Sequence, residues 1–327
     1  MRGIVLKTAV LAFAACFGLV AAATQAAPVR LDGPLTMIVG YAPGGPSDRA
    51  ARIIGQELQN NLGVIVTIEN RTGAGGQVAA AYLKGISATK NVVLLSNSAV
   101  MMVAPMVYKK LAYDPRADFK AVSMVAKYQF GVAVADDSPI KNMEGLVEWA
   151  RAHPDDFKIG VSATDNLAHF VGLMLADKIG VKTKIVGYQS SALPMAGLIN
   201  HTVPVAVDTL EVEVAQQLAK KIRILATSGS ERERQLSSLP TLTQAGIKVE
   251  ASGWNAFFAP ASMSDAKVEM LGNALMEVVS TPSVQKALQE NGLTPVVANA
   301  AKTVQLIEAF RQQWEPIIKA TGFVVEK

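Results

Sequence analysis

The sequence predicts an α/β fold of two lobes, each a central sheet flanked by helices. Short apolar runs rich in β-branched residues alternate with stretches of helical periodicity, which is typical of parallel strands covered by helices on both faces. A break at residues 113–119 separates two such series, and the extended segments 121–126 and 130–135 after it indicate crossovers into a second lobe. With 327 residues, half of them apolar, the chain is long enough for two domains of ordinary size.

The first 26 residues have the features of a secretory signal peptide. Arg2 and Lys7 form a basic start, residues 9–22 an apolar stretch, and Thr24 to Ala26 a small-residue cleavage site. We expect cleavage after Ala26 and export of a soluble mature chain to the periplasm. No later segment has the roughly 18 uninterrupted apolar residues that a membrane span needs.

Cysteine content and charge exclude several classes of protein. Cys16 is the only cysteine and lies in the leader, so the mature chain forms no disulfide and has no cysteine nucleophile. A lipid-modified Cys16 is a weaker alternative, because Phe13 stands where a lipobox prefers leucine. The formal charge of +4 falls to +2 without Arg2 and Lys7, and no basic cluster with interleaved aromatic residues occurs. Nucleic acid is therefore not an expected partner.

The first lobe opens with a strand, a glycine turn and a helix start. Residues 37–41 form a short apolar strand, residues 43–45 break it, and Pro46 suits the first position of a helix with Gly45 as its N-cap. The apolar residues that follow at helical spacing, and the glycine that stops them, are Ala50, Ile54, Leu58, Leu62 and Gly63.

The rest of the first lobe continues the alternation. We expect, in order, a strand at 64–69, a glycine turn at 70–76, a helix at 77–84 and a strand at 92–96. In parallel sheets of this kind ligands sit at the carboxyl ends of the strands, where the opening turn and Ser96, Asn97 and Ser98 gather.

The second lobe repeats this pattern, and the last portion of the chain returns to the first lobe. The second-lobe elements are a helix at 142–152, a strand at 158–162, a turn at 162–166, a helix from near 166, a strand at 184–187, a turn at 188–191 leading to another helix, and strands at 203–207 and 222–226. The returning portion has a strand at 254–260, helices at 265–279 and 300–320, and a short helix at 285–290 closed by a glycine. The second-lobe strands end in small polar residues able to donate hydrogen bonds.

The opening turn at 42–48 favours a carboxylate over a phosphate. It lacks the lysine and hydroxyl of a P-loop and the spacing of a dinucleotide fold, whereas a carboxylate needs only N–H donors at a helix N-terminus. The alternative is that the glycines have a structural role only, in making a tight turn. Asp48 can cap the helix by reaching back to Gly45, or it can face the ligand, where it would favour a water-bridged or amino-bearing solute.

A catalytic alternative rests on Ser162, Asp165 and His169, which are the residue types of a hydrolase. It is the weaker interpretation, because no nucleophile elbow surrounds Ser162 and we expect His169 to pack or cap. The other histidines, His153 and His201, have no paired spacing with it, so neither a metal nor any other cofactor is expected.

Several sequence blocks, in order, carry a resemblance to a known family. They are residues 41–48 (Tyr-Ala-Pro-Gly-Gly-Pro-Ser-Asp) with Ala51-Arg52, Leu62-Gly63, residues 66–76, residues 113–119, Arg232 to Arg234 before residues 239–246, and residues 254–260 (Trp-Asn-Ala-Phe-Phe-Ala-Pro). With these blocks, which span nearly the whole mature chain, it resembles the extracytoplasmic solute-binding receptors of the tripartite tricarboxylate transporter family, also called Bug receptors.

The resemblance implies a two-lobed periplasmic-binding-protein fold of the type II-like kind, whose lobes are joined by two crossing strands and close on a carboxylate like a flytrap. It implies no enzymatic activity, and it places one lobe at 27–125 plus 228–327 and the other at 126–227. The turn matching residues 42–48 would hold one carboxylate, and the turns of the second lobe would line the opposite wall. Together with the strand-end residues, the expected ligand-binding residues are Tyr41, Ala42, Pro43, Gly44, Gly45, Asp48, Ser96, Asn97, Ser98, Ser162, Ala163, Thr164, Asp165, Tyr188, Gln189, Ser190 and Asp208.

The second wall departs from the family pattern. Ala163 to Asn166 replace the usual glycines, and Gln189 replaces the lysine that commonly follows Tyr188. We therefore expect a small organic acid or a related carboxylate or amide, and not necessarily a simple dicarboxylate. The implied partner is a two-component membrane permease. Signalling to a sensor histidine kinase is the alternative, and we expect a monomer.

Overall fold

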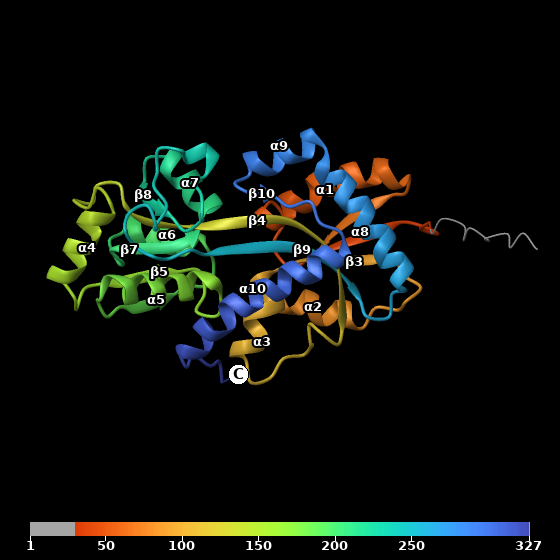
Figure 1. Cartoon of the computed structure of the whole chain (residues 1–327), viewed down its shortest axis with the longest axis horizontal. Helices are drawn as coiled ribbons and strands as arrows, with labels where there is room; N and C mark the ends of the chain where they lie inside the picture. Colours follow the sequence, from red (N-terminus) through yellow and green to blue (C-terminus); the bar gives the residue numbers. More distant parts are fainter. Residues whose placement is uncertain (1–29, 327) are drawn as a thin grey trace, which may run out of the picture.

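One strand, β4 (Phe119–Ala135), runs through both halves of the molecule and belongs to both of its sheets. The computed structural model describes residues 30–326, so the predicted leader and its cleavage site lie outside the described residues. Figure 1 shows two halves, each a sheet with helices packed against it, with β4 and β9 (Ser252–Pro260) running side by side between them. The predicted two-lobed α/β fold is confirmed.

The first half holds a mixed sheet. Its strands follow the order β2-β1-β3-β9-β4, with β10 also paired to β4. The remaining strands are β1 (Leu35–Val39), β2 (Val66–Asn70), β3 (Val92–Asn97) and β10 (Thr294–Pro295). β1 is parallel to β2 and β3, but β9 is antiparallel to β3 and β4. The parallel pairing expected for the first three strands is confirmed, and the sheet is mixed because β9 returns from the second half and runs against β3 and β4.

The second half is built on the far end of β4, which pairs antiparallel with β7 and β8. Its own strands are β5 (Lys158–Val161), β6 (Lys184–Gly187), β7 (Val205–Thr209) and β8 (Ile222–Thr227). β5 lies parallel to β6 and β7. The expected boundaries at 125/126 and 227/228 fall within β4 and directly after β8, and they stay a prediction.

Helices cover both sheets (Figure 1). They are α1 (Pro46–Leu62), α2 (Gln77–Lys84), α3 (Ala104–Val107), α4 (Met143–Ala152), α5 (Leu167–Ile179), α6 (Ala192–Ile199), α7 (Leu210–Leu218), α8 (Asp265–Ser280), α9 (Pro282–Glu290) and α10 (Ala300–Ala320), with short turns η1 (Ala74–Gly76), η2 (Ala99–Val103) and η3 (Arg234–Leu236).

The opening unit forms as the sequence predicts. Pro46 is the first residue of α1, Gly45 is its extended N-cap, and Gly63 ends it in a left-handed conformation with φ of +67°. The N–H of Gly63 donates to Gln59 O at 2.9 Å. α1 buries its apolar stripe, including Ile54 and Leu58, against the sheet.

Two features differ from the expectations. The two predicted crossover segments are one continuous strand: Lys127 and Gln129 interrupt the apolar run, but they alternate with buried Tyr128 and Phe130 and pair with β9. α7 is absent from the expectations because its apolar and acidic residues alternate with the period of a strand.

Candidate functional site

The opening turn is held by its own hydrogen bonds. The N–H of Gly45 donates to Ala42 O at 3.2 Å, and Nη1 of Arg49 donates to Gly44 O at 2.7 Å. Gly44 has a φ of +77°, a left-handed conformation that glycine adopts without strain. Ala42, Pro43 and Gly44 are exposed, so the turn presents its backbone at the N-terminus of α1, whose first N–H groups lack intrahelical partners.

Asp48 lies behind this turn and is 1% exposed. Its carboxylate accepts hydrogen bonds from the N–H of Gly44 at 2.8 Å, from Nε and Nη2 of Arg52 at 2.8 and 3.0 Å, and from Nδ2 of Asn70 at 2.9 Å. These bonds, led by those of Arg52, hold the pKa of Asp48 down to about 2. Asp48 therefore bonds to Gly44 and not to the Gly45 N–H that a capping box would use, and its four acceptor positions are filled within the chain.

Tyr41 joins the opening turn to the second glycine turn. Its hydroxyl donates to Gly75 O at 2.9 Å and accepts from Nδ2 of Asn97 at 2.6 Å. Burial raises the pKa of Tyr41 to about 12, so the phenol stays protonated at neutral pH. The two turns touch backbone to backbone, since a Cβ on Gly40 would lie 2.9 Å from the Cα of Gly76.

The end of β3 contributes one half-exposed side chain. Ser96 and Ser98 are buried, and Ser98 Oγ lies 3.3 Å from the hydroxyl of Tyr128. Asn97 lies between them, and its Oδ1 accepts the N–H of Val100 at 3.2 Å. Of the three predicted residues, Asn97 is the one that combines exposure with a link to Tyr41.

Asp208 ties the two predicted turns of the second wall together. Its Oδ1 accepts hydrogen bonds from the hydroxyls of Ser162 at 3.2 Å and Ser191 at 3.1 Å, and from the N–H of Thr209 at 2.7 Å. Nδ2 of Asn166 in turn donates to Ser162 Oγ at 3.0 Å. Burial raises the pKa of Asp208 to about 6. Turns that are far apart in sequence thus share one carboxylate.

The other residues of the second wall differ in exposure. Thr164, Gln189 and Ser190 are exposed, and Ala163 is partly buried. The ring of Tyr188 packs onto the second sheet, because a Cβ on Gly160 of β5 would meet its Cε2 at 3.3 Å.

Residues of the first half contact residues that lie beside the second wall. The hydroxyl of Tyr108, in the first half, donates to Asp165 in the second. Glu211 at the start of α7 lies against Gly292 of the first half, where an added Cβ would approach the Glu211 Cβ to 3.0 Å. Burial raises the pKa of Glu211 to about 8, and the positive charge of Arg49 opposes that rise. The structure therefore brings the opening turn, through Arg49, near the second wall.

The geometry does not support the hydrolase alternative. Ser162 Oγ bonds to Asp208 and Asn166, while Nδ1 of His169 bonds to the carbonyl of Thr164. Burial lowers the pKa of His169. Among residues 30–326 no hydrogen bond joins the serine to the histidine, and the ring of His169 instead packs edge-on against Phe323 at 4.7 Å between centroids, as expected for a packing role.

Sequence reasoning missed Tyr108, Glu211 and Glu213. Nothing local marks Tyr108, which reaches its partner through the fold. The two glutamates could have been noticed, since they follow Asp208 directly after a strand that ends at the expected ligand-binding edge.

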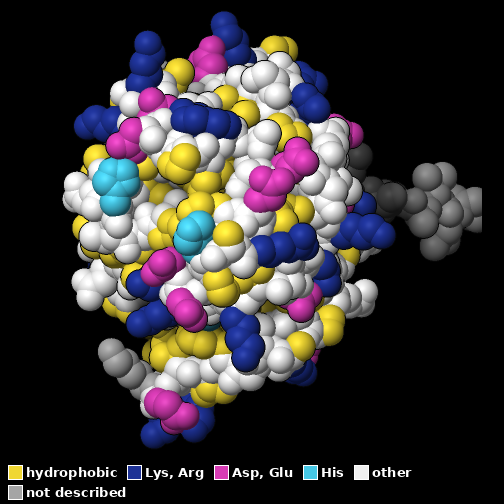
Figure 2. Space-filling view, turned by 90° about the vertical axis from the view of Figure 1, so that its left-hand side faces the viewer, with side chains coloured by type: hydrophobic (Ala, Val, Ile, Leu, Met, Phe, Trp, Pro, Cys, Tyr) yellow, Lys and Arg dark blue, Asp and Glu magenta, His cyan; other side chains and the backbone are white. Residues whose placement is uncertain are grey.

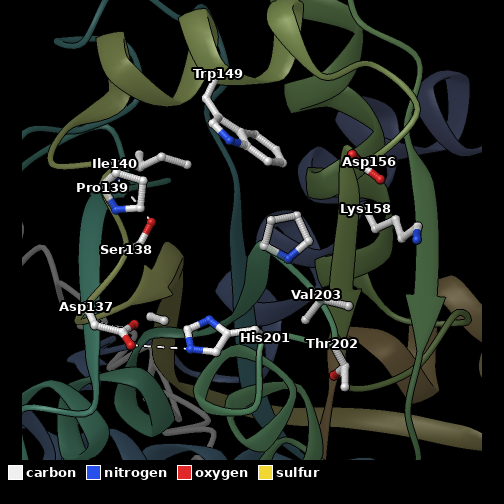
Figure 3. Close-up of a pocket in the computed structure, with 12 residues that line it drawn as sticks. Asp137, Ser138, Pro139, Ile140, Trp149, Asp156, Lys158, His201, Thr202 and Val203 are labelled. Carbon is white, nitrogen blue, oxygen red and sulfur yellow. Dashed lines mark hydrogen bonds and ion pairs between the residues drawn. The ribbon is translucent and has the colours of Figure 1, made fainter.

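Two surface hollows lie away from these walls. One, of about 390 Å³, opens at the far end of the second half, where Figure 3 shows the Asp137–His201 ion pair at 3.3 Å below Trp149. Figure 2 shows the same end of the molecule, with acidic, basic and histidine side chains mixed over it. The other lies between α8 and the C-terminal end of α1. Neither includes a predicted site residue.

Residues 30–326 hold neither a candidate metal site nor a helix able to span a membrane. Their histidine and acidic side chains form no group of three or more suited to a metal ion. No helix in this part of the chain has the length and hydropathy to cross a membrane.

Comparisons with known proteins identify relatives along nearly the whole chain. BugT of Bordetella pertussis is 26% identical over 309 residues, covering 93% of this chain and 95% of BugT. A protein from the TAR-I ttuE-ttuC' intergenic region of Agrobacterium vitis is 29% identical over 289 residues, covering 88% of this chain and 83% of that protein.

Solved structures show the same fold. Rpa4515 of R. palustris, determined with adipate, superposes with a TM-score of 0.83 at 27% identity, covering 90% of this chain and 98% of that one. The periplasmic binding protein BugD superposes with a TM-score of 0.78 at 24% identity, covering 90% and 99%. The family model described as "Tripartite tricarboxylate transporter family receptor" matches residues 50–323. The chain therefore belongs to the tripartite tricarboxylate transporter receptor family, whose members are periplasmic solute-binding receptors and not enzymes.

Proposed function

We propose that this receptor captures a small carboxylate-bearing solute between its halves and delivers it to a two-component membrane permease of the tripartite tricarboxylate type. The main support is that turns at the ends of strands from the two halves lie near one another. The opening turn faces one side at the N-terminus of α1, and Ser162 and Ser191, both tied to Asp208, stand on the other. The adipate held by Rpa4515, a relative 27% identical to this chain, supports a carboxylate as the ligand class.

The chemistry of capture follows from the geometry of the opening turn. The N–H groups of Gly44 and Gly45 are engaged within the chain, so a carboxylate at this turn would meet the first-turn N–H groups of α1. Closing of the halves would replace the hydration of the solute with these donors and with groups of the second wall. The Tyr108–Asp165 hydrogen bond joins the halves and would break when they open.

A thermal-denaturation screen of the mature chain tests this function. Organic acids, amino acids and aromatic acids are supplied at millimolar concentration. A ligand that binds the folded chain raises its free energy of unfolding by about 2.7 kcal/mol at a concentration one hundred times Kd, and the Tm rises with it. If no carboxylate or amide raises the Tm, the proposal is wrong.

A matched pair of variants tests the opening turn as the anchor. Gly44→Val adds a side chain into open space at a φ of +77°, and Gly180→Val does the same at a φ of +73° at the end of α5. Both strain a left-handed turn, so both should lower the Tm of the free protein to a similar degree. Only Gly44→Val should lose the ligand-induced rise, and retention of that rise would count against the anchor.

Partner and oligomeric state need separate measurements. Affinity capture from detergent-solubilised membranes, with the solute present, should recover a two-component permease if delivery is the role. Recovery of a histidine kinase would favour sensing. Light scattering should give the mass of one chain.

A further inference from the structure

Three carboxyl groups with unpartnered oxygens lie where β7 passes into α7. Asp208 and Glu213 are fully buried, and Glu211 is partly buried. One oxygen of each, Oδ2 of Asp208 and Oε2 of the two glutamates, accepts no hydrogen bond from the described protein atoms. By contrast Oε1 of Glu213 accepts the N–H of Asp208 at 3.2 Å. A buried acceptor without a donor is unfavourable, so the unpartnered oxygens of the neighbouring Asp208 and Glu213 indicate a site for a donor from outside the chain.

A buried hydroxyl points to the same place. Asp208 and Thr227 are the cross-strand partners of Gly131 on its two sides, so their side chains share one face of the sheet. The Glu213 carboxylate covers Gly131 on that face, since a Cβ there would lie 1.6 Å from Glu213 Oε2. Thr227 is fully buried, and its Oγ1 also has no hydrogen-bond partner in the described chain. A non-acidic polar group thus joins the acids.

The chemistry of these groups favours a cation that carries several hydrogen-bond donors. Burial and the neighbouring Asp208 raise the pKa of Glu213 well above its usual range, and no basic side chain opposes that rise. The raised pKa leaves Glu213 protonated in the free protein. A bound ammonium group would lower that pKa and pair with the carboxylate, whereas a bare carboxylate would gain no such pair. A metal ion does not fit, because among residues 30–326 no three acidic or histidine side chains converge on one point to hold it. A protonated amine offers up to three N–H donors and no acceptor, which matches unpartnered acceptors.

The acids lie beside the two walls. Ser162 and Ser191 of the second wall bond to the other oxygen of Asp208. Glu211 lies across from Arg49, which donates to the carbonyl of Gly44 in the opening turn. A solute anchored by its carboxylate at the opening turn can therefore extend its other end toward the acids.

We propose that Asp208, Glu213 and Thr227, here called the acid cluster, form a subsite for a protonated amino group. The solute is then a carboxylate that also carries an ammonium group. This inference rests on the proposed function as a carboxylate receptor and narrows its solute class.

Titration calorimetry with matched probes tests the acid cluster. Adipate is compared with 6-aminohexanoate, and malate with aspartate, so that in each pair an ammonium group replaces a carboxylate or a hydroxyl. The amino member of a pair should bind about tenfold tighter or more, the size expected for hydrogen bonds between charged groups. Glu213→Gln and Thr227→Val should each reduce that preference. Glu148→Gln, which changes an exposed acid on α4, should leave it unchanged.

The outcomes separate the two proposals. If the members without an ammonium bind as tightly or tighter, the amine subsite is wrong while the receptor function stands. If variants that remain folded by circular dichroism keep the amino preference, the cluster is structural and the inference fails. Absence of binding by every carboxylate defeats the proposed function as well.

Discussion

Replacement of Asp48 tests how the opening turn is held in place. In Asp48→Asn the geometry is nearly kept, but the charge that pairs with Arg52 is lost and an amide N–H₂ must face at least one of the donors of Arg52 and Asn70. The folded pKa of about 2 lies nearly two units below the usual 3.8, and each unit corresponds to about 1.4 kcal/mol. Because the Arg52 side chain is 53% exposed, solvent screening reduces the effect, and we expect a loss of about 2 kcal/mol at pH 7.

The pH dependence has a definite sign. A carboxylate whose folded pKa is depressed stabilises the fold above its unfolded pKa and loses that contribution as pH falls through the folded value. The free energies of unfolding of wild type and Asp48→Asn should therefore differ fully at pH 7 and converge between about pH 4 and pH 2. Urea denaturation at pH 7, 4 and 2.5 measures this difference.

A control separates the buried pair from ordinary surface charge. Asp177 is 73% exposed and pairs with Lys178 at 2.8 Å, so Asp177→Asn should cost about 0–1 kcal/mol at every pH. Equal urea midpoints for Asp48→Asn and wild type at pH 7 would refute the structural role. A difference that persists undiminished at pH 2.5 would show that charge is not its source.

Three further predictions concern the second wall and its contact with the first. Gly131→Ala should lower stability by about 2 kcal/mol in urea denaturation, since its Cβ would overlap the buried Glu213 carboxylate; full wild-type stability contradicts the packing. Tyr108→Phe removes the hydrogen bond to Asp165 across the halves and should enlarge the radius of gyration in small-angle scattering, so an unchanged radius would show that this bond does not hold the halves together. The folded pKa of Glu211, about 8, lies above its usual value, so the folded state binds the extra proton and stability falls as pH rises from about 5 to 8; Glu211→Gln should flatten the Tm over that range, and an equally steep fall would disprove the assignment.

Local signals account for the elements that the sequence predicts well. Gly45, Pro46 and Gly63 bound α1 through cap and turn conformations that depend on neighbouring residues alone. The continuity of β4 could not be predicted in this way. Lys127 and Gln129 look like a break in sequence, and only pairing with β9, more than a hundred residues away, keeps them in a strand.

The site, like the fold, has parts that local sequence predicts and parts that it does not. The turns that line it are predictable, because glycines and small polar residues after strands mark them. Their connections are not: Ser162 and Ser191 reach Asp208 over 46 and 17 residues, and Tyr108 reaches Asp165 over 57. These separations are set by topology, and no local pattern reports them.

The spacing of the two glutamates in α7 divides their roles. Residues two apart in a helix point about 200° apart around its axis, so Glu211 and Glu213 cannot face the same neighbour. The Glu213 carboxylate packs over Gly131 within the second half, and this contact does not depend on whether the halves are closed. Glu211 turns toward Gly292 and Arg49 of the first half, contacts that exist only while the halves meet. Substitution of Glu213 should therefore alter which solute is bound, whereas substitution of Glu211 should alter how firmly the halves close on it.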